Sequence, residues 1–164
     1  MPIIGTDIKY RFSGGAANSN PLLSLGGAKS SVDATGSLFD NVDSAEALAG
    51  DIEYRCYYVH NGHATLTMLN AKAWIKTNTP SADTVLAMGL GTSALNGTEQ
   101  TVANENTAPT GVSFSAAADE ANSIALGDIP PGQSRAVWVR RTVTASAVAA
   151  SDGATLTAKC DTLA

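Results

Sequence analysis

The stretch that decides the fold is IEYRCYYVHN, residues 52–61, in which two sets of side chains alternate. Successive side chains of a β-strand point to opposite faces of a sheet, so every second residue shares a face. One face of this stretch would carry Ile52, Tyr54, Cys56 and Tyr58, and the other Arg55, Tyr57 and Val59. Because this alternation is typical of strands, residues 52–61 are predicted to form a β-strand with two interleaved faces.

Runs of the same kind recur on both sides of this stretch and are separated by turn signals. They lie at residues 6–12, 64–77, 84–90, 111–115, 121–127, 134–143 and 154–160. Asn61-Gly62 is a tight-turn dipeptide, and DIPPG at 128–132 combines prolines that fix φ with a glycine that permits positive φ. We therefore predict an all-β fold, an antiparallel two-sheet sandwich of about seven to nine strands.

The segment 13–37 differs from the rest because it is rich in glycine and serine and shows no period. A compact domain rarely holds so long a loop without structure of its own. The segment also contains Leu22, Leu23 and Leu25, for which a solvated linker has no use. We predict an extended N-terminal arm that becomes ordered on a neighbouring subunit, with these three leucines at the interface.

Residues 38–51, LFDNVDSAEALAGD, predict one short helix. Asp43 fits the N-cap position, Glu46 is its capping-box partner three residues later, and Gly50 supplies a left-handed stop. A helix of barely two turns is expected to plug one end of a sheet. The expected organisation is thus a first strand, arm and helix in residues 1–50, followed by a β-sandwich domain in residues 51–164.

Charge and apolar content exclude several classes of protein. Charged residues make up 15% of the chain and the net charge is −5, so no basic groove for nucleic acid is expected. No apolar stretch approaches the roughly 18 residues that cross a membrane, and MPIIGTDIKYRF at the N-terminus does not resemble a secretion signal. A surface this poor in charge is unusual for a protein that stays soluble alone. We expect neighbours to cover much of it in a homo-oligomeric assembly.

The candidate chemical groups favour structural roles. The motifs G-x-S-x-G and G-x-x-x-x-G-K-[ST] are absent, and His60 and His63 are expected to be exposed at a loop tip rather than to bind a metal. Four carboxylates could supply oxygens to Ca²⁺: Asp40, Asp43, Glu46 and Asp51. Their spacing does not match a calcium loop, and capping already uses two of them. No catalytic residue, cofactor or metal site is predicted.

Cys56 and Cys160 are far apart in the sequence. Two buried thiols in a protein made in a reducing cytoplasm are the favoured interpretation. A disulfide between them would require their two strands to meet across the core, and nothing in the sequence places the two residues together.

Aromatic residues suggest a second kind of surface. Trp138 is expected in the core, whereas Trp74, flanked by lysines on the same strand face, is expected at a rim or interface. Trp74, Tyr57 and the loop 91–110 could together form a platform on which sugar rings stack. This carbohydrate- or host-receptor-binding module is the rival from another functional class.

Several longer strings resemble a known family. They are SGGAANSNPLLSLGGAKSS, LFDNVDSAEALAGDIEYRCYYVHN, NAKAWIKTNTPSADT and LGDIPPGQSRAVWVRRTV. Through them, residues of about 7–145 resemble a family of small virion structural proteins of tailed bacteriophages. The stretch from YYVHNG to IPPGQSRAVWV is also similar to immunoglobulin-like domains, a likeness at the level of fold alone.

The resemblance implies a non-enzymatic structural component of a tailed-phage virion, synthesised in the host bacterial cytoplasm. Its partners would be other capsid or tail subunits, and the role expected first is that of a capsid decoration or cement protein. A tail, baseplate or fibre-attachment protein is the alternative.

Overall fold

A computed structural model describes residues 1–148 and 153–162 of the chain. Within these residues there is one α-helix, α1 (Ser44–Ala49), and two single 3₁₀ turns, η1 (Gly5–Asp7) and η2 (Pro21–Leu23). The strands are β1 (Ile8–Phe12), β2 (Gly26–Gly27), β3 (Asp51–Asn61), β4 (Met68–Thr77), β5 (Thr84–Leu90), β6 (Glu99–Thr101), β7 (Ile124–Ile129), β8 (Ser134–Val143) and β9 (Thr155–Asp161). No helix among the described residues has the length and apolar character needed to cross a membrane.

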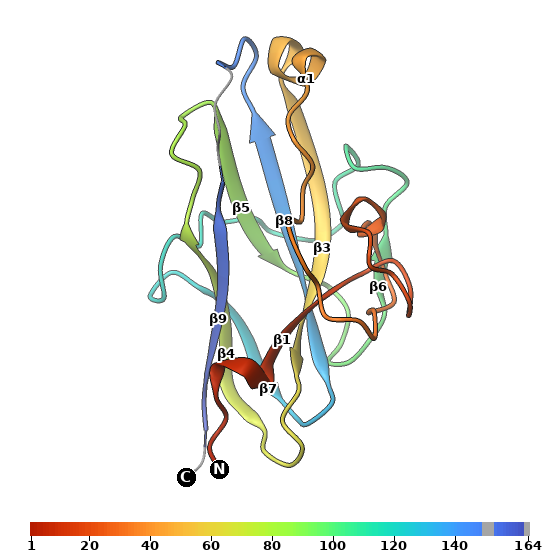
Figure 1. Cartoon of the computed structure of the whole chain (residues 1–164), viewed down its shortest axis with the longest axis vertical. Coiled ribbons are helices and arrows are strands. Elements are labelled where there is room, and N and C mark those ends of the chain that lie inside the picture. Colours follow the sequence, from red (N-terminus) through yellow and green to blue (C-terminus); the bar gives the residue numbers. More distant parts are fainter. Residues whose placement is uncertain (149–152, 163–164) are drawn as a thin grey trace.

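The strands form two main antiparallel sheets that face each other (Figure 1). One sheet has the order β1-β3-β8-β5 and the other the order β7-β4-β9. The prediction of an all-β, antiparallel two-sheet sandwich with one short helix is therefore confirmed. The immunoglobulin-like part of that prediction stays a prediction, since it rests on a likeness at the level of fold alone.

The main core lies between these two sheets. It is built from the inward faces of both, with Val59 and Val139 from the four-stranded sheet opposite Ile75 and Ile129 from the three-stranded one. All four side chains are almost fully buried. Alternate residues of β3 thus point into this core, as the sequence predicts for the face that carries Val59.

A second core lies on the opposite face of the four-stranded sheet. Its buried members are Tyr54, Cys56, Tyr58, Val102, Ala136 and Trp138, and Leu25, Val112 and Phe114 pack against them. The cover comes from the segment 13–37, from the loop 91–115 and from the small sheet β2-β6 that joins the two. The four-stranded sheet is therefore covered on both faces, and for this reason the middle of β3, residues 56–59, is apolar on both.

The segment 13–37 does not extend away from the domain. The Ser30 N–H donates to the Phe12 carbonyl at 2.9 Å, the Cys56 N–H to the Ser24 carbonyl at 2.7 Å, and the Tyr58 hydroxyl to the Gly27 carbonyl at 2.6 Å. The expectation that a neighbouring subunit orders this arm is corrected in this respect: contacts within the chain order it. Residues 1–50 and 51–164 also share one sheet, because β1 pairs with β3.

The Asn61-Gly62 dipeptide does not make a hairpin. β3 and β4 belong to different sheets, so residues 62–67 carry the chain across the end of the sandwich. The buried Asn61 side chain holds this crossing, donating to the carbonyls of Leu66 and Ile129 at 2.8 Å and accepting from the His63 N–H at 2.9 Å. The chain does change direction at this dipeptide, but the prediction of a tight turn between paired strands was wrong.

Candidate functional site

The end of the sandwich beside α1 carries buried charges. Asp51, Glu53 and Arg55 alternate on the inward face of β3, and Glu53 is directly opposite Arg141 of β8. The side chains of Glu53 and Arg55 are 1% and 0% exposed, and that of Arg141 is 6% exposed. Ionised groups are expensive to bury unless they are paired, so their partners decide whether this end of the core is stable.

Each arginine has acidic partners. Arg141 pairs with Glu53 and lies 3.3 Å from the Asp40 carboxylate, and it also donates to the Asp40 backbone carbonyl. Arg55 pairs with Glu105, and its Nη2 lies 3.9 Å from Glu53 Oε1. The guanidinium carbons of Arg141 and Arg55 lie 4.9 and 5.7 Å from the centre of the Phe39 ring. Arg141 and Arg55 thus hold the segment that contains Phe39 and Asp40 over the end of the core.

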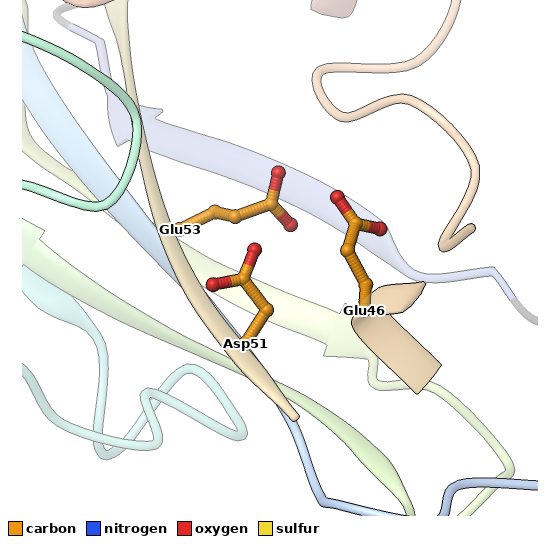
Figure 2. A group of neighbouring side chains, drawn as sticks. All are labelled: Glu46, Asp51 and Glu53. Atoms are coloured by element: carbon orange, nitrogen blue, oxygen red, sulfur yellow. The ribbon is translucent and has the colours of Figure 1, made fainter. Parts of the chain in front are cut away.

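Three carboxylates converge at this end of the molecule. Figure 2 shows Asp51 and Glu53 on β3 and Glu46 on α1, with their carboxylates turned toward one another. One oxygen of each lies within 4.8 Å of the others. Glu46 is placed there by the predicted capping box, in which the Asp43 carboxylate accepts the N–H groups of Ala45 and Glu46 and Glu46 accepts the Asp43 N–H.

Each of these carboxylates has one oxygen in hydrogen bonds. Glu46 Oε2 accepts from the Asp43 N–H at 2.8 Å, and Asp51 Oδ1 accepts from the Ile52 N–H at 2.8 Å and the Asn106 amide at 2.6 Å. Glu53 Oε2 binds Arg141, whereas the buried Oε1 has no hydrogen-bond partner among the described residues. A buried acceptor left in this state costs free energy, so the cluster has a capacity for binding that the protein itself does not use.

Burial raises the pKa of Glu53 to about 7, and the negative charge of Glu46 adds to the rise, while Arg141 and Arg55 oppose it. The folded chain therefore holds a proton on Glu53 at a pH where the unfolded chain has released it. Folding takes up that proton between about pH 4.5 and 7, so this group makes the free energy of unfolding fall as the pH rises through that window.

We expect the Glu53→Gln variant to lose this part of the pH dependence. The raised pKa corresponds to a contribution of roughly 3 kcal/mol at pH 5 relative to pH 8. Urea unfolding of both proteins at the two pH values measures it, and subtracting the variant's curve removes the titration of other groups. An unchanged pH slope in the variant would show that Glu53 ionises normally in the folded chain.

A cavity of about 580 Å³ opens beside the ion network. Leu38, Phe39, Leu86 and Leu156 are among its apolar lining residues. Its charged lining residues are already engaged, since Asp40 and Arg141 pair with each other and Asp43 caps α1. The cavity therefore offers a ligand no unpaired charge from the described residues.

The calcium option considered from the sequence is rearranged in the structure. Glu46 and Asp51 meet as that option required, but Asp43 is used in the cap and Asp40 pairs with Arg141. The third member of the cluster is Glu53, which the sequence reasoning missed. The i, i+2 spacing of Asp51 and Glu53 on a strand was the signal that could have found it, because such residues share a face.

The three predicted interface leucines separate into two groups. Leu25 packs on the second core, whereas Leu22 and Leu23 are 44% and 57% exposed. Both exposed leucines lie on η2, which Asn20 caps through a 3.0 Å hydrogen bond from the Leu22 N–H. Leu25 is thus a structural residue, and Leu22 with Leu23 forms an exposed apolar pair.

The structure does not bring the predicted sugar platform together. Tyr57 is 3% exposed and lies in the core between the sheets, so it cannot stack on a ligand. Trp74 is half-buried on β4 and packs against the main core, so its rim or interface position stays a prediction. The loop 91–110 covers the far side of the four-stranded sheet. The platform hypothesis was wrong because its members lie in three different layers.

The remaining candidates also have structural surroundings. Cys56 and Cys160 are both free, one in the second core and one against the main core, and burial raises the pKa of the Cys56 thiol. His60 is not at an exposed loop tip: it is buried, its Nδ1 lies 3.1 Å from Lys29 Nζ, and burial lowers its pKa to about 4. His63 Nδ1 accepts the backbone N–H groups of Thr65 and Leu66. Trp138 is fully buried, as predicted.

Comparison with protein families, with curated proteins and with solved structures gives no match to this chain.

Proposed function

We propose that the chain is a non-enzymatic structural component of a tailed-phage virion, and in the first instance a capsid decoration or cement protein. The observation that carries this proposal is the exposed leucine pair on a rigid turn. Exposed single leucines are ordinary on protein surfaces, but two adjacent exposed leucines in a fixed position indicate a site of contact with another protein.

The turn that displays the pair is held from both sides. The Leu23 N–H donates to the Asn20 carbonyl at 3.2 Å, and the Ser24 N–H donates to the Pro21 carbonyl at 2.9 Å. On the C-terminal side, Leu25 is anchored in the second core. A surface that is ordered before binding loses little conformational entropy when it binds, and this favours affinity from a small contact.

The composition supports the same proposal. A charged fraction of only 15% suits a surface that neighbouring subunits cover. On a particle with many equivalent positions, weak contacts act together, so a small apolar pair on each copy is sufficient. The resemblance of residues of about 7–145 to small virion proteins is the reason for proposing that this particle is a tailed-phage virion.

A tail, baseplate or fibre-attachment role uses the same kind of surface and is the alternative. Imaging of intact particles at modest resolution distinguishes the two, since decoration protein covers the capsid lattice, while the others are confined to the tail. A sugar-binding role has less support, because Trp74 would act without the other members of its platform.

We expect the double variant Leu22→Asp, Leu23→Asp to fold normally and to be incorporated into particles at least tenfold less. Both side chains are exposed, so the melting temperature should move by no more than a few degrees, while two charges would oppose an apolar contact. Quantitative mass spectrometry of purified particles gives the copy number. Leu95→Asp is the matched control, because Leu95 is 37% exposed and lies outside the turn. Normal copy number in the double variant would sink the interface proposal.

A further inference from the structure

We propose that the carboxylates of Glu46, Asp51 and Glu53 bind a calcium ion at the α1 end of the sandwich. The proposal starts from Glu53, whose side chain is 1% exposed and whose Oε1 has no hydrogen-bond partner among the described residues. Figure 2 shows this carboxylate directed toward the other two. Arg55 Nη2 lies 3.9 Å from this oxygen, too far for a hydrogen bond, and a buried carboxylate oxygen without a donor is a position that a cation would satisfy.

The spacing of the oxygens suits calcium. One oxygen from each residue lies within 4.8 Å of the others, and calcium binds oxygens at about 2.4 Å, so two ligands on opposite sides of the ion are about 4.8 Å apart. Glu46 and Asp51 are half-buried, which leaves the open side of the site to water. Calcium accepts such mixed shells of carboxylate and water oxygens.

The chain holds the ligands in place before any ion binds. Gly50 ends α1 with φ 78°, and its N–H donates to the Glu46 carbonyl at 2.7 Å, which turns the chain from Glu46 directly into β3. The helix is also tied to the segment after β8, since the Ala147 N–H donates to the Ala47 carbonyl at 2.9 Å. The ligands of the ion thus come from two elements whose relative position is fixed.

The local charge favours a cation. Besides the three carboxylates, Asp40, Asp43 and Glu105 lie in the same network, and the basic residues in it are Arg55 and Arg141. Both arginines have other acidic partners, so neither neutralises the cluster fully. The local balance is six acidic against two basic groups, whereas the whole chain carries −5.

The ligand chemistry selects the class of metal. All three ligands are carboxylates, which suit calcium and magnesium, whereas zinc and copper favour imidazole and thiolate. Magnesium needs a tighter octahedron with oxygens at about 2.1 Å, and the Glu53 carboxylate cannot move freely because its other oxygen is held by Arg141. We therefore expect calcium to bind more tightly than magnesium.

The test is calorimetric titration of the purified full-length chain, freed of metal with a chelator, with CaCl₂ and separately with MgCl₂. We expect one calcium site with a dissociation constant of roughly 10⁻⁵–10⁻³ M. Calcium at a hundred times that constant should raise the melting temperature by about 5 °C or more. Absence of calcium binding overturns the proposal, and magnesium binding of equal affinity overturns the choice of calcium.

Three variants locate the site. Glu46→Gln and Asp51→Asn keep an oxygen that can accept the native hydrogen bonds, so both should fold, and each should weaken calcium binding at least tenfold. Glu120→Gln is the matched control, because Glu120 is a carboxylate paired with Lys72 and Lys159 away from the site. If the first two variants bind calcium as the native chain does, the ion lies elsewhere and the proposal is wrong. The test uses no particles, so its failure would leave the virion proposal untouched.

Discussion

Removal of residues 1–37 is expected to leave a chain that does not fold into a soluble monomer. The deletion removes β1, which pairs with residues 57–61 of β3, and it removes the part of the second core's cover that Leu25 and its neighbours supply. Tyrosine and tryptophan bury about 150–250 Å² each, and each Å² of apolar surface is worth about 25 cal/mol. Partial uncovering of two tyrosines and Trp138 therefore costs several kcal/mol, much of the roughly 5–15 kcal/mol that keeps a domain folded.

The measurement is the soluble yield of the truncated chain, followed by circular dichroism and size-exclusion chromatography. Two point variants supply the control within the same segment. Leu25→Asp places a charge against the second core and should destabilise the chain strongly, whereas Leu23→Asp changes an exposed residue and should not. A truncated chain that is monomeric and fully folded would show that the cover is dispensable.

This prediction reverses what composition alone suggests. A glycine-rich segment with few charges is predicted to be an arm that becomes ordered only on a partner, because nothing in it shows the period of a strand or helix. In the structure, Gly26 pairs with Thr101 in a sheet whose strands have two and three residues. Such strands are too short to show alternation, and their partner lies far away in the sequence. A Cβ on Gly26 would collide with the Gln100 carbonyl, so the glycine permits a close approach that no local pattern reveals.

The elements with strong local signals were predictable. β5 and β8 occupy residues 84–90 and 134–143 as the alternation predicts, and the capping box of α1 forms as its spacing predicts. Residues 111–115 form only an isolated bridge, between Ser115 and Met88. Local alternation predicts a strand, but a regular strand forms only where a partner strand is available. The partner cannot be read from the neighbouring residues of the sequence.

The candidate site was partly predictable for the same reason. Glu46 and Asp51 are five residues apart, and a helix followed by a glycine stop brings them near each other. Arg141, in contrast, reaches Glu53 across 88 residues of sequence. Only the register of β3 against β8 makes them partners, and this register is set by the whole sheet.

We expect Arg141→Met to destabilise the chain by about 3–5 kcal/mol at pH 8, because the variant leaves Glu53 buried without its closest counter-charge. The methionine fills a similar volume, so a new cavity is not the cause. The hydrogen bond to the Asp40 carbonyl and the contact with the Phe39 ring are lost too. Amides of residues 37–43 should therefore exchange faster with solvent in hydrogen-exchange experiments.

The loss caused by Arg141→Met should be clearly smaller at pH 5. Arg141 lowers the pKa of Glu53, so the Arg141→Met variant should have an even higher pKa at Glu53. The free energy of unfolding of the variant should then continue to fall up to a higher pH than that of the native chain. At pH 5 the folded state carries a neutral Glu53 in both proteins, and only the contacts with Asp40 and Phe39 distinguish them. Urea unfolding at both pH values measures this, and Glu53→Gln together with Arg141→Met should recover much of the loss at pH 8. A loss that is the same at both pH values, and is not recovered in the double variant, would mean that Arg141 stabilises the chain by packing alone.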